Sequence, residues 1–139
     1  MAKRQQEKDA PESQIERCAH TVCRLPIAFQ ARGNISMVGL IEETGYSALA
    51  DDVTESVLEE RLRRHPELVP VWVQYSEDQR CTPAFGLSGP AEPAKDWRVF
   101  YRDHDPANRW DRAFPDQFTA CAFFIKRNAE RLVATSRQR

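Results

Sequence analysis

Three short stretches of the chain carry side chains that could do chemistry. Cys18, His20 and Cys23 spell C-x-H-x-x-C, which suggests a zinc site. On a helix, however, two positions five residues apart point about 140° away from each other. Cys81 and Cys121 have no cysteine or histidine at the two-to-four-residue spacing of zinc ligands. We therefore expect buried or partly buried thiols, with no metal and no cofactor.

A nucleophilic cysteine is the second chemical candidate. Cys81 follows Arg80 in a loop, and a neighbouring positive charge lowers the pKa of a thiol. Such a nucleophile also needs a base. The sequence ties none of its three histidines to Cys81 by any motif, so we expect an incidental loop cysteine.

The third candidate is the cluster Asp103, His104 and Asp105, which resembles half of a metal or hydrolase site. It precedes Pro106 and has no second cluster to complete it, so a polar turn explains it. The chain also lacks a glycine-rich phosphate loop, a G-x-S-x-G elbow and an H-E-x-x-H pair. We expect a non-enzymatic protein, with a small enzyme that uses a loop Cys/His site as the alternative.

Length and composition indicate one soluble domain. The chain has 139 residues, of which 41% are hydrophobic and 29% charged. No stretch approaches the ~20 apolar residues that span a bilayer. The start, MAKRQQEKDAPES, lacks the apolar core of a signal peptide. We predict a disordered leader over residues 1–12, a single domain over 13–139, a cytoplasmic location and reduced cysteines.

Charge is unevenly distributed along the chain although the net charge is only -1. Residues 42–60 contain seven acids and no Lys or Arg, whereas residues 126–139 contain five basic residues and one acid. The acidic segment predicts a basic protein partner, and the basic end makes a weak nucleic-acid binder an alternative. The predicted partner-binding residues are Glu42, Glu43, Asp51, Glu55, Glu59, Glu77, Asp78, Arg80 and Phe123.

Cap residues and apolar spacing predict helices in the first half. Ser13 and Glu16 have the spacing of a capping box, and the helix that they begin would end near Pro26. Residues 34–45 form a second helix capped by Asn34, unless IAFQ and ISMV pair as a hairpin. Asp52 would cap a third helix, with a buried stripe and basic residues near its end.

The segment after Pro66 has two alternatives. Leu68, Val69, Trp72 and Tyr75 share one helical face, which favours a helix. Pro70 and the alternation of apolar residues over 69–75 favour a strand instead.

The second half predicts a small sheet followed by a long helix. WRVFYR, residues 97–102, reads as a strand that pairs with AFGL. A stripe from Phe114 to Val133 predicts the last helix, with Pro115 at its first position. Phe123 and Phe124 fall on either side of that stripe, so the helix is either sandwiched in the core or presents these rings to a partner, including a second copy in a homodimer. The fold class is therefore α+β, mostly helical, with a small antiparallel sheet.

One stretch, HPELVPVWVQYSEDQR, places aromatic residues beside a dense set of charges. That composition serves as scaffold and is also typical of protein interfaces. Together with the later ACAFFIKRNAERL, it resembles the pattern of small bacterial proteins of uncertain role, across about residues 46–132. Some proteins of this kind look like immunity proteins, which neutralise a toxin by covering it. The resemblance implies binding without catalysis.

Overall fold

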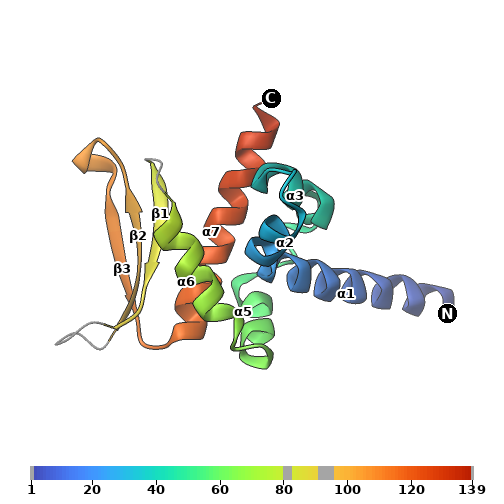
Figure 1. Ribbon diagram of the computed structural model, residues 1–139. Coiled ribbons are helices and arrows are strands. Elements are labelled where there is room, and N and C mark those ends of the chain that lie inside the picture. Colours follow the sequence, from blue (N-terminus) through green and yellow to red (C-terminus); the bar gives the residue numbers. More distant parts are fainter. Residues whose placement is uncertain (1, 80–82, 91–95, 139) are drawn as a thin grey trace.

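The structure is a computed structural model that describes the backbone of residues 2–79, 83–90 and 96–138, with side chains from residue 12 onward. It is mostly helical with one three-stranded antiparallel sheet (Figure 1), which confirms the predicted α+β class. The helices are α1 (Ala2–Cys23), α2 (Leu25–Arg32), α3 (Met37–Thr44), α4 (Tyr46–Leu49), α5 (Glu55–Arg64), α6 (Leu68–Asp78) and α7 (Gln117–Arg137). The strands are β1 (Ala84–Ser88), β2 (Trp97–Arg102) and β3 (Trp110–Phe114), and a 3-10 turn covers Pro106–Asn108.

Helix α7 is the centre of the molecule. The sheet lies on one side of it, and α1 lies on the opposite side (Figure 1). Helices α3, α5 and α6 also contact α7 directly. Because neighbours surround α7, its apolar residues are not confined to a single stripe, and every residue over 120–125 is buried.

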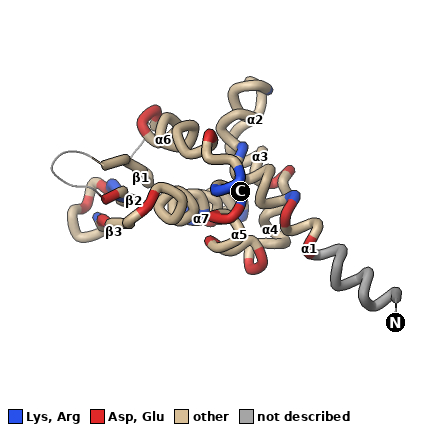
Figure 2. The backbone as a smooth tube through the Cα atoms, turned by 90° about the horizontal axis from the view of Figure 1, so that it is seen from below, with Lys and Arg blue, Asp and Glu red and all other residues tan. Residues whose placement is uncertain are grey.

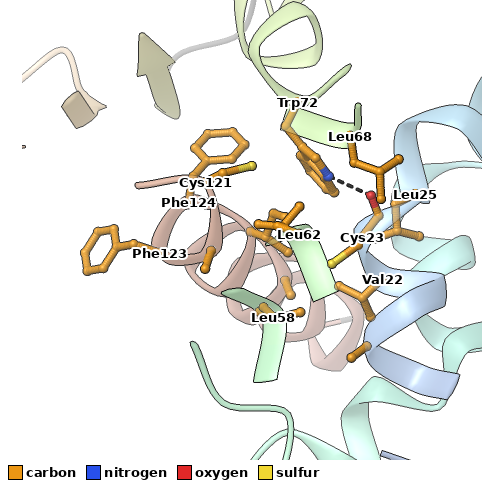
Figure 3. Packing of buried hydrophobic residues seen from close by; sticks show 14 of the residues in the cluster. Val22, Cys23, Leu25, Leu58, Leu62, Leu68, Trp72, Cys121, Phe123 and Phe124 are labelled. Carbon is orange, nitrogen blue, oxygen red and sulfur yellow. Dashed lines mark hydrogen bonds between the residues drawn. The ribbon is translucent and has the colours of Figure 1, made fainter. Parts of the chain in front are cut away.

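The sandwich predicted for α7 is therefore confirmed, and its two adjacent phenylalanines are buried on different sides. Phe124 is fully buried and packs edge-on against Trp72 at 5.9 Å between ring centroids. Phe123 is 4% exposed and points away from Trp72, toward the sheet (Figure 3). As a buried ring, Phe123 is not an exposed partner contact of the kind that the sequence suggested.

Side-chain caps fix the starts of α3 and α5, at positions close to those predicted. The Ser36 hydroxyl accepts from the Gly39 amide at the start of α3, so Ser36 replaces the predicted cap Asn34. The Thr54 hydroxyl accepts from the Val57 amide at the start of α5, in place of Asp52. Each of these residues directly precedes its helix with extended φ and ψ, which is what capping requires.

The N-terminal helix begins earlier than the capping box predicted. Helix α1 runs from Ala2, so Ser13 lies inside it and Ser13 as an N-cap is wrong. The same helix includes residues 2–12, where composition suggested a disordered leader; the boundary of the globular domain stays a prediction. Helix α1 ends at Cys23, close to Pro26, which occupies the first turn of α2. Because α2 contains the IAFQ segment, the hairpin alternative is wrong.

Helix α6 settles the alternative between helix and strand in favour of helix. Pro70 is its third residue, where a backbone N–H would have no partner within the helix, so the proline removes no intrahelical hydrogen bond there. Trp72 is fully buried, and its indole N–H donates to the Cys23 carbonyl at 2.7 Å (Figure 3). This bond joins α6 to the end of α1. The strand alternative for residues 69–75 is wrong.

The sheet has the order β1-β2-β3, with both pairs antiparallel. The predicted pairing of β1 with β2 is confirmed, and Gly86 is opposite Phe100, whose ring lies where a Cβ on Gly86 would be. Strand β3 was not predicted. It contains Phe114, which the sequence assigned to the last helix, and α7 begins after Asp116 rather than with Pro115.

Among the described helices, none is long and apolar enough to cross a membrane.

Candidate functional site

Of the three candidate chemical sites, the structure describes two, and the zinc candidate does not assemble within the described residues. Cys18 and Cys23 are buried and free, and no group of three Cys, His, Asp or Glu residues within the described ranges could hold a metal. Burial raises the pKa of the Cys23 thiol to about 12, so it is protonated and a poor nucleophile at neutral pH. Cys81 and Arg80 lie outside the described residues.

The Asp103–Asp105 cluster is the predicted polar turn. The Asp103 carboxylate accepts from the Asp105 amide and the Asn108 side chain, while Asp105 caps the 3-10 turn. His104 is exposed. All of these hydrogen bonds are local, so they account for the cluster without a ligand.

Three of the seven acids of the acidic segment are paired with arginines in the folded chain. Glu43 pairs with Arg32, Glu59 with Arg63, and Glu60 with Arg64. Acidic positions are spread over several elements rather than gathered on one face (Figure 2). The seven acids counted along the sequence therefore do not form one free acidic surface.

Two other predicted partner-binding residues of this segment, Asp51 and Glu55, lie near Lys126. The Lys126 ammonium donates to the backbone carbonyls of Ala50 and Val53, the latter at 2.8 Å. Burial lowers the pKa of Lys126, and the nearby carboxylates of Asp51 and Glu55 act in the opposite direction. Lys126 thus fastens the turn between α4 and α5 to α7, and it offsets the two exposed acids that flank this turn.

The other predicted contacts are dispersed. Glu42 accepts from the Ser136 hydroxyl near the end of α7. Glu77 and Asp78 are exposed at the end of α6, on a different helix from the acidic segment. Asp78 lines an open groove of about 620 Å³ between α2 and α6, beside Phe29, which is 40% exposed. The structure therefore does not bring the predicted partner-binding residues together.

Instead, aromatic residues converge where the sheet meets α7. Phe85, Tyr101 and Trp110 are opposite one another across β1, β2 and β3 and form a row. The Tyr101 and Trp110 rings are stacked at 17° with centroids 6.2 Å apart, and Phe85 lies 5.1 Å from Tyr101. Trp110 is 37% exposed, which is unusual for so large an apolar side chain.

Arginines frame this aromatic row. The Arg112 guanidinium lies 4.9 Å from the centroid of Phe123, and the Arg127 guanidinium lies 4.8 Å from the same centroid. Arg131 lies 5.8 Å from Phe85 and donates to the Pro83 carbonyl. We call this set the aromatic-arginine surface; its members are Phe85, Tyr101, Trp110, Arg112, Phe123, Arg127 and Arg131.

The aromatic-arginine surface has an excess of positive charge. Its one recorded ion pair joins Arg127 to Glu130 at 3.5 Å, within the described ranges. Asp111 is next to the surface, but its carboxylate is engaged by Arg98. An open hollow of about 540 Å³ lies between the sheet and α7, lined by Phe85, Trp110, Asp111, Arg112, Phe123 and Arg127.

Sequence reasoning missed this site because it missed β3. A signal was present: WDRAF follows a polar turn, DHDPAN, that directly follows the predicted strand WRVFYR. Two short aromatic segments around such a turn are typical of a hairpin. Assigning Phe114 to the last helix hid this pattern, and with it the neighbours of Phe123.

Comparison of the chain with known protein families, with curated proteins and with solved structures finds no match.

Proposed function

We propose that this chain is a non-enzymatic protein-binding module whose docking site is the aromatic-arginine surface. The observation that carries the proposal is the placement of exposed Trp110 beside two guanidinium groups that share the Phe123 ring. Trp, Tyr and Arg are the residues most enriched in the hot spots of protein interfaces. The immunity-type role that the sequence suggested, in which a protein neutralises a toxin by covering it, is one form of such binding.

The preorganisation of the arginines supports this proposal. Arg112 and Arg127 are both held over the Phe123 ring. A ring contact leaves guanidinium N–H groups available to a partner, and the one carboxylate paired with either arginine within the described residues is Glu130, at 3.5 Å from Arg127. Side chains that are already positioned lose less entropy when a partner binds. The fold thus holds two positive charges at one ring, although like charges repel each other.

The distribution of charge supports an anionic patch on the partner rather than the basic partner that the sequence suggested. The acidic segment is compensated by Arg32, Arg63 and Arg64, while the aromatic-arginine surface is not compensated to the same degree. Complementary charge speeds association and selects partners.

Affinity capture with matched variants tests the proposal. Wild-type protein, Trp110→Ala and Phe29→Ala are immobilised and exposed to an extract of the organism that encodes the chain. Phe29 is an equally exposed aromatic residue elsewhere, 40% against 37% for Trp110, so it controls for nonspecific stickiness. We expect a protein retained by wild type and by Phe29→Ala and lost with Trp110→Ala. Identical retention by all three would refute the proposed surface.

A second candidate function follows from the same aromatic row. Stacked aromatic rings beside arginines also suit the bases and phosphates of single-stranded nucleic acid. Asp111 and Glu130 border the surface and make it less favourable for a polyanion. Binding of a single-stranded oligonucleotide that weakens steeply with salt and requires Trp110 would favour this candidate over a protein partner.

A further inference from the structure

The two edges of the sheet differ in how they are covered. At β1, the Leu87 amide donates to the Ser76 hydroxyl of α6 at 2.7 Å, and Ser76 is buried. Helix α6 therefore covers this edge. At the other end of the sheet order, β3 pairs with β2 alone among the described strands, and it is the outermost element on its side of the molecule (Figure 1).

An open strand edge presents unpaired backbone groups, and proteins usually guard such edges with charged side chains. The charges on β3 are engaged elsewhere. The Asp111 carboxylate is paired with Arg98 of β2, and the Arg112 guanidinium is drawn over Phe114 and Phe123, toward α7. Neither charge is left free to guard the edge.

This edge also borders the aromatic-arginine surface. Trp110, Arg112 and Phe114 alternate along β3, so they share the face of the sheet that contacts α7. A strand added next to β3 would lie about 4.8 Å away, and its side chains on this face would be neighbours of Trp110 and Arg112. Arg127 of α7 lies over the Phe123 ring, which Arg112 also contacts.

We propose that β3 accepts an extended acidic segment of a protein partner as a fourth strand of the sheet. Backbone hydrogen bonds to the edge of β3 supply affinity that does not depend on sequence, and alternate side chains supply specificity. Acidic side chains of the segment face Arg112 and Arg127, and an apolar side chain covers Trp110. This inference rests on the proposed docking surface and adds the mode of recognition and the chemistry of the partner segment.

The test uses a seven-residue synthetic peptide with blocked ends, Thr-Val-Thr-Glu-Thr-Glu-Thr, in which one valine and two glutamates lie on the same side of an extended strand. Its matched controls are the same peptide methylated on alternate backbone nitrogens, made in both registers, and a peptide in which lysine replaces glutamate. Each is titrated into the full chain to about 1 mM while the amide signals of residues 110–114 are followed by NMR. Amide hydrogen exchange is measured in the same samples.

We expect saturable binding of the glutamate peptide, slower exchange of amides in β3, and at least tenfold weaker binding of one methylated register, of the lysine peptide and of the Arg112→Ala variant. Absence of binding, or equal binding of both methylated registers, overturns strand addition. If Trp110→Ala nevertheless abolishes capture of a protein partner, the docking surface stands and strand addition alone fails. If capture is also unchanged, both proposals fail.

Discussion

Arg112 and Arg127 lie over one aromatic ring, with their guanidinium carbons 4.9 Å and 4.8 Å from the centroid of Phe123. The electron-rich ring attracts both cations and so offsets part of the repulsion between them. Phe123 also contacts Phe114 and Trp110. A buried residue of the core therefore organises the charged surface above it, which links the stability of the fold to the geometry of the docking site.

Phe123→Ala should lower the free energy of unfolding by about 3–5 kcal/mol, because it empties a buried site against Trp110 and Phe114 of β3. Phe29→Ala, at an exposed ring of α2, should change stability by no more than about 0.5 kcal/mol. Urea unfolding of both variants checks the prediction. Equal effects of the two substitutions would show that Phe123 is not a core residue.

Trp72→Phe should cost about 1–3 kcal/mol even though it retains an aromatic ring, because the buried Cys23 carbonyl loses its donor. Trp97→Phe is the matched control, since no hydrogen bond of the Trp97 indole is recorded within the described residues and its side chain is only partly buried. Unfolding in urea measures both. A smaller loss for Trp72→Phe than for Trp97→Phe would contradict the role assigned to this bond.

Asp116 should make stability depend on pH in the acid range. Burial opposes its ionisation, but hydrogen bonds from Thr119 and Phe118 and the charge of Arg63 outweigh burial and lower the pKa of Asp116. A lowered pKa stabilises the fold above the unfolded carboxyl pKa of about 3.9, and this contribution disappears as the pH falls through the folded value.

Asp116→Ala should therefore cost about 1 kcal/mol at pH 7, and the difference from wild type should shrink near pH 3. Asp116→Asn keeps an oxygen acceptor for the amides of Phe118 and Thr119, so it should cost less and show no such change with pH. Unfolding measured at both pH values distinguishes the variants. A constant difference for Asp116→Ala would mean that its charge contributes nothing.

His20 should act on stability near neutral pH. Its ring lies 5.4 Å from that of His65, and its Nδ1 is buried without a partner in the described residues. Burial lowers the pKa of His20, and the charges of Arg61, His65 and Arg24 act in the same direction. The neutral form thus stabilises the fold above the unfolded pKa of about 6.5, and that stability is lost as the pH falls through the folded pKa.

His20→Gln should reduce the loss of stability between pH 7.5 and pH 5.5, because glutamine takes up no proton. His104→Gln, at an exposed histidine in the turn before β3, should leave the wild-type profile unchanged. Thermal unfolding across this pH range checks both. If the two variants have the same profile, His20 is not the group responsible.

Much of the fold could be predicted from local patterns. The stripe that includes Leu58 and Leu62 identified α5, and the strand WRVFYR paired as expected, because burial on one face imposes a period that a sequence displays. The starts of α3 and α5 were each displaced by two residues, since Ser36 and Thr54 compete with neighbouring residues that can also cap.

The candidate site could not be predicted in the same way, because it depends on contacts between distant segments. Arg127 and Trp110 meet only once β3 and α7 pack together. The free acidic surface expected from residues 42–60 has the same explanation. Counting charges along the chain ignores Arg32, which pairs with Glu43 from a different helix. Long-range pairing of charges and rings leaves no periodic signal in a single sequence.

The most direct test of the docking surface is the dissociation constant of the captured partner, measured by calorimetry. We expect at least a tenfold rise in this constant for Arg112→Ala combined with Arg127→Ala, which corresponds to about 1.4 kcal/mol. The control combines Asp51→Asn with Glu55→Gln on the acidic segment, and it should change the constant by less than about twofold. A wild-type affinity for the arginine variant, or a tenfold loss for the acidic variant, would contradict the account.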